Sequence, residues 1–258
     1  MLAIFGNPAY DFIGWRRWAY GVSIVAMALG VGSMLLKGGL RYDIDFTGGT
    51  LVEVRLAEPM SVGTIRSHLT AAGLGESIIQ TLGEPRDVLI RTQAGGDAAE
   101  LSRRVGDALA GGGAGAAEIR RAEFVGPQIG QELRRHALYA VLAALAGILL
   151  YVWARFDLKG GVVTIVSLAH DVLICLGALS LANLEFSLAV LAALLTVIGF
   201  SVNDRIVMYD RLREIRSRRG DKGVSFAAQV NLAVNQTLSR TVLTVATVAM
   251  AAATLYLF

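Results

Sequence analysis

Residues 186–209 read FSLAVLAALLTVIGFSVNDRIVMY, and this stretch decides the class of fold. As a helix it is long enough to cross a hydrocarbon core of about 30 Å, which takes roughly 20 mostly apolar residues. Four further stretches have the same character: residues 15–36, 137–154, 162–182 and 235–258. The sequence therefore predicts a multi-pass α-helical membrane protein with five spans.

The composition agrees with this class. The 258 residues are 54% hydrophobic and 17% charged, whereas an ordinary soluble domain is about 25% charged. Most of the 21 acidic residues lie between residues 41 and 135. This uneven distribution excludes a soluble enzyme, a disordered regulator and a nucleic-acid-binding protein. The single cysteine, Cys175, excludes an intrachain disulfide and a cysteine-rich metal site.

The polar segment between the first two spans, residues 38–136, is predicted to be a separate domain. Its hydrophobic periodicity indicates the order strand, helix, strand, strand, helix, strand, at residues 50–56, 61–73, 77–83, 86–92, 97–110 and 116–125. This order is typical of an α+β, ferredoxin-like sandwich. Before the first strand, Gly48 and Gly49 are expected to form a turn with positive φ, because a phosphate-binding loop would also need a lysine and a following helix.

The basic residues near the spans predict the orientation, since short loops rich in Lys and Arg face the cytoplasm. By parity they all fall on one side of the membrane: Arg16, Arg17, Arg155, Lys159, Arg205, Arg211, Arg213, Arg216, Arg218, Arg219 and Lys222. The N-terminus and a basic loop at residues 210–234 are therefore expected in the cytoplasm, and residues 38–136 on the opposite side. The basic loop would attract anionic lipids or form a docking surface for a partner.

Four ionisable residues interrupt the apolar spans: His170, Asp171, Asp204 and Arg240. A charge at mid-bilayer costs on the order of 2.5 to 3.5 kcal/mol, so each is a candidate functional residue. Asp204 and Arg240 are predicted to lie at one depth on antiparallel spans, where an ion pair would act as a proton switch or would merely fix the helix packing. For His170 and Asp171 a packing role is favoured, because adjacent helical residues point about 100° apart.

Five motifs in order cover most of the chain: Asp45-Phe-Thr-Gly-Gly-Thr50, Val125-Gly-Pro-Gln-Ile-Gly-Gln-Glu-Leu133, Ala169-His-Asp-Val172, Gly199-Phe-Ser-Val-Asn-Asp204 with Tyr209-Asp-Arg-Leu-Arg-Glu214, and Asn235-Gln-Thr-Leu-Ser-Arg-Thr241. Together they resemble the SecF family of the bacterial SecDF protein-export complex, in the resistance-nodulation-division (RND) superfamily. The resemblance marks the following as motif residues with structural roles: Asp45, Gly48, Gly49, Gly126, Pro127, His170, Asp171, Asn203, Asp210 and Arg211.

The resemblance implies a subunit of the bacterial inner membrane with its inserted domain in the periplasm. It implies SecD, the SecYEG channel, YajC, YidC, the translocating preprotein and membrane lipids as partners, and no nucleic acid. Proton transfer would involve Asp204 and Arg240, driven by the proton gradient, without a cofactor, a metal or enzyme activity. Two alternatives stay open, namely a scaffold without proton work and one half of an RND exporter of small molecules or lipids.

Two features depart from the family pattern. Arg205 stands where many relatives carry a small residue such as threonine, and a second guanidinium beside Asp204 would lower the pKa of that carboxyl or extend toward the cytoplasm. The family also continues into a sixth span, so we expect this chain to be one helix short.

Overall fold

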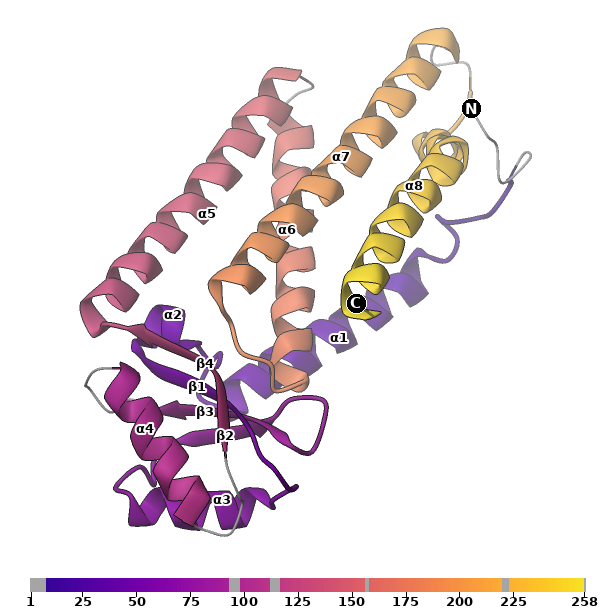
Figure 1. The fold of residues 1–258 in the computed structure, drawn as a ribbon. Coiled ribbons are helices and arrows are strands. Elements are labelled where there is room, and N and C mark those ends of the chain that lie inside the picture. Colours follow the sequence, from indigo (N-terminus) through magenta and orange to yellow (C-terminus); the bar gives the residue numbers. More distant parts are fainter. Residues whose placement is uncertain (1–7, 93–97, 112–116, 156–157, 220–222, 258) are drawn as a thin grey trace. The chain divides into compact units, whose positions relative to one another are not determined.

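A computed structural model describes residues 8–92, 98–111, 117–155, 158–219 and 223–257 (Figure 1). Within these ranges, five helices are long and apolar enough to cross a membrane. They are α1 Arg16–Leu36, α5 Pro127–Arg155, α6 Leu158–Leu181, α7 Leu188–Arg219 and α8 Phe226–Leu257. The predicted multi-pass membrane fold is confirmed.

Three of the long helices extend well beyond the predicted spans. Helix α5 begins at Pro127, α7 continues to Arg219 and α8 begins at Phe226. Most of the expected loop at residues 210–234 is therefore helical, and the prediction of a loop there is wrong. Hydropathy detects only the apolar part of a helix, whereas Arg, Glu, Gln and Ala continue the helix into polar surroundings, and proline is tolerated in a first turn.

The inserted domain has the predicted βαββαβ order. Its elements are β1 Gly49–Arg55, α3 Val62–Ala71, β2 Ile78–Thr81, β3 Asp87–Thr92, α4 Ala98–Leu109 and β4 Glu118–Val125. The four strands form an antiparallel sheet in the order β2-β3-β1-β4, and Figure 1 shows α3 and α4 on one side of it. Alternate strand residues such as Val52, Val54, Val88 and Ile90 are buried against both helices, which confirms the ferredoxin-like interpretation.

The chain divides into two compact units, which are described separately. The membrane unit comprises residues 1–40, 142–184 and 192–258, and the domain unit comprises residues 41–141 and 185–191. The domain unit thus includes the second half of the link between α6 and α7, from Glu185 onward, together with the first residues of α7. Helices α5 and α7 each begin in the domain unit and continue into the membrane unit.

Small residues allow α1 and α6 to approach closely in the membrane unit. A Cβ added to Gly30 would lie 2.6 Å from the Cα of Gly177, and the hydroxyls of Ser33 and Ser180 are hydrogen-bonded at 2.9 Å. Paired small residues of this kind are typical of helix crossings within membranes. On the other side of α6, Leu168 packs against α7.

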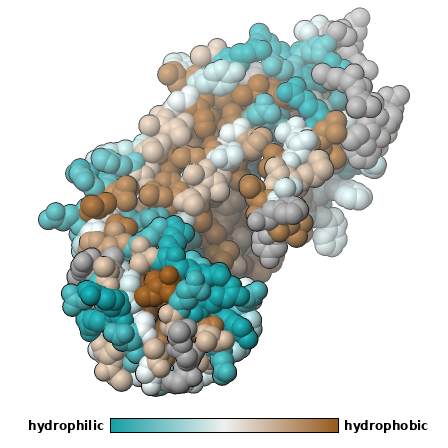
Figure 2. Space-filling model, viewed as in Figure 1, coloured by the Kyte–Doolittle hydropathy of each residue, from teal (hydrophilic) through white to brown (hydrophobic). Residues whose placement is uncertain are grey.

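Large apolar side chains cover the outside of the long helices. Trp15, Trp18, Leu36, Leu255 and Leu257 are all at least 74% exposed. Figure 2 shows apolar residues along the helices and hydrophilic residues over the inserted domain. Such an apolar helical surface is suited to the interior of a lipid bilayer, because lipid tails are as apolar as these side chains.

Candidate functional site

Asp204 lies on α7 beside a cavity of about 280 Å³. Helix α7 contributes Ser201, Asp204, Arg205 and Met208 to the lining, and α8 contributes Val234, Thr237, Leu238 and Thr241. The carboxylate is half-buried. Three hydroxyl-bearing side chains share the cavity with it, namely Ser201, Thr237 and Thr241, and such groups are hydrogen-bond partners for water.

Arg240 lies next to this cavity along α8 but does not line it. Its neighbour Thr241 does line it, while Arg240 is exposed. Among the ion pairs of the described residues there is none between Asp204 and Arg240, so the structure does not bring the two charges of the predicted pair together. Thr237 and Thr241 are four residues apart and share one face of α8, and both line the cavity, whereas the Arg240 side chain does not.

The charge pair that the structure does form joins α6 and α7 through Asp171 and Arg205. The Arg205 guanidinium donates to Asp171 Oδ2 at 2.6 Å and to the Ser167 hydroxyl at 3.1 and 2.5 Å, and it also donates to Ser201. Ser201 itself donates to Asp171 Oδ2 at 2.5 Å. This partner was not predicted from the sequence. One expectation placed the Arg205 guanidinium beside Asp204, and the other placed it toward the cytoplasm.

His170 takes part in the same network. Its Nδ1 lies 3.0 Å from Asp171 Oδ1. The two adjacent side chains thus contact each other, although His170 is 36% exposed and Asp171 is 26% exposed. We call these five residues the Asp171 network: Ser167, His170, Asp171, Ser201 and Arg205.

The remaining motif residues on α7 lie toward its C-terminal end. Asn203 is exposed. Asp210 accepts a hydrogen bond at 2.9 Å from Arg155, the last residue of α5. Arg211 donates to Gln236 of α8 at 2.7 Å and forms an ion pair with Glu214. Asp210 and Arg211 thus link α7 to α5 and α8, which is a structural role.

The two glycine-containing motifs pack directly on each other in the domain unit. Gly48 and Gly49 have φ of 73° and 129°, as predicted for this turn. A Cβ on Gly48 would lie 2.8 Å from the Cα of Pro127, and a Cβ on Gly130 would lie 2.9 Å from the Gly48 nitrogen. Because neither position has room for a side chain, the start of α5 can lie against the turn that leads into β1.

Asp45 also has a structural role that the sequence did not reveal. It lies in the short helix α2 Ile44–Thr47, and its Oδ2 accepts a hydrogen bond of 2.9 Å from the backbone NH of Leu188, the first residue of α7. The first NH groups of a helix lack partners within the helix, and a carboxylate there is favoured by the helix dipole. Asp45 therefore caps α7.

Sequence reasoning missed a charged cluster around Glu185, which lies in the link between α6 and α7. Its side chain is 8% exposed and forms ion pairs with Arg91 of β3 and with Arg41, the latter at 3.4 Å. Gln80 of β2 donates to it at 3.3 Å. Burial lowers the pKa of the Arg91 guanidinium, while the nearby Asp43 carboxylate partly offsets this. The signal in the sequence was one acidic residue in the short link between two apolar spans.

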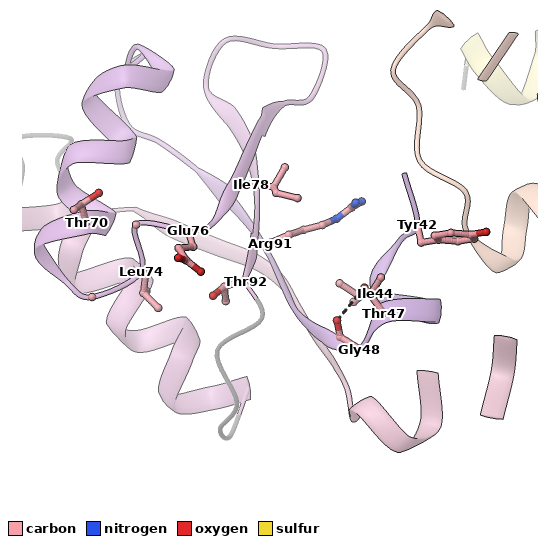
Figure 3. Close-up of a pocket in the computed structure, with 12 residues that line it drawn as sticks. Tyr42, Ile44, Thr47, Gly48, Thr70, Leu74, Glu76, Ile78, Arg91 and Thr92 are labelled. Atoms are coloured by element: carbon pink, nitrogen blue, oxygen red, sulfur yellow. Dashed lines mark hydrogen bonds between the residues drawn. The ribbon is translucent and has the colours of Figure 1, made fainter. Parts of the chain in front are cut away.

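Backbone and aromatic contacts hold the same link. Phe186 exchanges backbone hydrogen bonds with Arg41 and Asp43, at 2.7 and 3.0 Å, and its ring stacks on Phe46 with centroids 5.6 Å apart. A cavity of about 890 Å³ lies next to these contacts. Figure 3 shows Arg91 extending from the sheet toward Tyr42.

Among the described residues, no group of three or more His, Cys, Asp or Glu side chains could hold a metal ion. Within the membrane unit, Asp204 lies beside the cavity and Asp171 lies in the network that joins α6 to α7.

The family models and the related sequences that match this chain all belong to one family of protein-export subunits. Residues 105–258 match the C-terminal family of the protein export membrane proteins SecD and SecF, and residues 34–60 match the SecD/SecF GG motif. The chain is 42% identical to the protein translocase subunit SecF of Desulfurispirillum indicum and 40% identical to that of Pseudomonas aeruginosa, in each case over 96% of this chain and 80% of the relative. The SecF subunit of Escherichia coli O157:H7 is 37% identical, over 98% of this chain and 78% of the relative.

A solved structure agrees with these sequences. The crystal structure of SecDF from Thermus thermophilus, a translocon-associated membrane protein, superimposes with a TM-score of 0.80 and 40% identity. The match covers 92% of this chain and 32% of that one, so this chain spans about a third of the solved protein. With most of its length shared with these subunits, the chain belongs to the SecF family of protein translocase subunits.

Proposed function

We propose that this chain couples proton flow to late-stage translocation of preproteins across the bacterial inner membrane, as an accessory subunit of the Sec translocase. The observation that carries the proposal is the Asp204 carboxylate beside a hydroxyl-lined cavity between two membrane helices. An ionisable group within a span is costly and is therefore a functional candidate. A proton that crosses the membrane potential supplies about 2.3 kcal/mol per 100 mV, enough to bias two conformations.

Arg240 is the cation that we assign to this site. It adjoins the cavity residue Thr241, and arginine has a long side chain that can change its partner. A guanidinium that approaches Asp204 favours the charged carboxylate, and one that departs favours protonation. The exposed position of Arg240 leaves its side chain free to make such a movement in the proposed switch.

The proposed partners are SecD, the SecYEG channel, YajC, YidC, membrane lipids and the translocating preprotein. The solved relative is a SecDF chain about three times as long as the matched region, which supports SecD as the neighbour that covers exposed helices such as α1 and α8. Following the distribution of basic residues, we place the N-terminus in the cytoplasm and the inserted domain in the periplasm.

The test is Asp204→Asn in the full-length subunit expressed with SecD. We expect gradient-dependent export of a pulse-labelled preprotein to fall at least 10-fold, because asparagine cannot carry a proton, while co-purification with SecD is unchanged. The control is Asp107→Asn, which removes an exposed charge from α4 and should leave export normal. Normal export in Asp204→Asn would instead identify the subunit as a scaffold without proton work.

A further inference from the structure

The Asp171 network is a partly buried group of charged and polar residues in the membrane unit, separate from Asp204 and Arg240. Each oxygen of the Asp171 carboxylate has its own partner: Oδ1 faces His170 Nδ1 at 3.0 Å, and Oδ2 accepts from Ser201 at 2.5 Å and from Arg205 at 2.6 Å. Asp171 and Arg205 are 26% and 18% exposed. A continuous chain of hydrogen bonds therefore runs from Ser201 on α7 to His170 on α6.

This network adjoins the cavity that contains Asp204. Ser201 and Arg205 bond to Asp171, and the same two side chains line the Asp204 cavity. The cavity of about 280 Å³ has room for water molecules, so a hydrogen-bonded path of water and the Ser201 hydroxyl can join the two carboxylates. The titratable or charged side chains around this path are His170 and Cys175 on α6 and Asp204 and Arg205 on α7; the cavity lining from α8 is uncharged.

A packing role alone does not explain the composition of the network. Helix packing in membranes is achieved with small residues and neutral hydroxyls, as α1 and α6 show with their glycines and serines. Here α6 adds a carboxylate and an imidazole, and the Nε2 atom of His170 is buried without a hydrogen-bond partner among the described residues. A side chain that can take up a proton at one nitrogen and release one at the other is a common proton shuttle.

We propose that Asp171 is a second proton-carrying carboxylate, which exchanges protons with Asp204 through Ser201 and for which Arg205 is the counter-ion. This inference rests on the proposed role of Asp204. In the transfer, a proton leaves the Asp204 carboxyl for cavity water, and the Ser201 hydroxyl accepts a proton from that water while giving its own to Asp171 Oδ2. Asp171 becomes neutral and its ion pair with Arg205 is lost. The carboxyl then rotates to bring its proton to the side of Oδ1, and it passes that proton to His170 Nδ1 of an imidazole whose own hydrogen is on Nε2, which leaves Asp171 ionised and His170 as the imidazolium.

Ser201 provides the sharpest test, because its variants change no charge. In inverted membrane vesicles that hold the full-length subunit with SecD, the probe is gradient-driven proton uptake, followed with a pH-sensitive dye. We expect Ser201→Ala to slow uptake about 10-fold or more, the usual effect of losing a proton-transfer group. Ser201→Thr keeps the hydroxyl and should restore the rate. Equal rates for Ser201→Ala and the parent protein would overturn the proposal.

Asp171 itself is tested with a charge-balanced variant, since Asp171→Asn leaves Arg205 unpaired and can prevent assembly. The double variant Asp171→Asn with Arg205→Gln removes both charges together, and co-purification with SecD reports assembly. Loss of proton uptake in an assembled double variant supports the proposal. Normal uptake there, with uptake abolished in Asp204→Asn, overturns the proposal and leaves the proposed function intact. Normal uptake in Asp204→Asn overturns both.

Discussion

At the scale of single residues, Gly48 shows how little freedom the GG motif has. It combines a φ of 73° with a site where a Cβ would lie 2.8 Å from the Cα of Pro127. With a ψ of 168°, Gly48 occupies a backbone region that is essentially restricted to glycine and that costs another residue about 1–3 kcal/mol, and the neighbouring atom is backbone that cannot move aside alone. We therefore expect Gly48→Ala to destabilise the inserted domain by more than about 3 kcal/mol, measured by urea unfolding of the detergent-solubilised protein.

Gly83 provides the matched control, because its φ is 60° and nothing lies within 4 Å of an added Cβ. Gly83→Ala should cost only the backbone strain of about 1–2 kcal/mol. Equal losses in the two variants would mean that the contact with Pro127 contributes nothing.

Much of the fold and part of the site follow from the sequence, because they depend on local patterns. Apolar length predicted the five membrane helices, and alternation along residues 50–56 and 86–92 predicted two of the strands. The position of Asp204 on an apolar helix is likewise visible in the chain. The partners of Arg205 and Glu185 are not, since they depend on how α6 and α7 are rotated about their axes and on which strand meets the α6–α7 link. Sequence spacing does not determine either.

At the scale of elements, the crossing of α1 and α6 depends on Gly30 and Gly177. A Cβ on either glycine would lie within 2.7 Å of the other's Cα, so no side chain can be accommodated without separating the helices. We expect Gly30→Leu to abolish a disulfide between Ser33→Cys and Ser180→Cys, whose hydroxyls are 2.9 Å apart, in a background in which Cys175 is replaced by Ala.

The control for this crossing is Gly32→Leu on the same helix, where nothing lies within 4 Å of an added Cβ. Cross-linking should proceed there as in the parent pair, as measured by the mobility of the oxidised protein on a gel. Efficient cross-linking in Gly30→Leu would show that α1 and α6 do not require the close approach.

At the scale of the whole molecule, α7 connects the Glu185 cluster to the candidate proton site. The helix begins at Leu188 in the domain unit, capped by Asp45, and continues through Asp204 in the membrane unit. The strength with which Glu185 is held determines how firmly the domain unit retains the start of that element.

A double-mutant cycle with Glu185→Gln and Arg91→Gln measures that strength. The two side chains are 8% and 13% exposed, so water and salt screen the pair weakly, and we expect a coupling free energy of about 2 kcal/mol. The readout is the unfolding free energy of the domain in the full-length protein. The same cycle on Arg55 and Glu84, which are 34% and 65% exposed, should give less than about 1 kcal/mol. If the buried pair coupled no more strongly than this exposed one, the Glu185–Arg91 ion pair would not be what holds the start of α7.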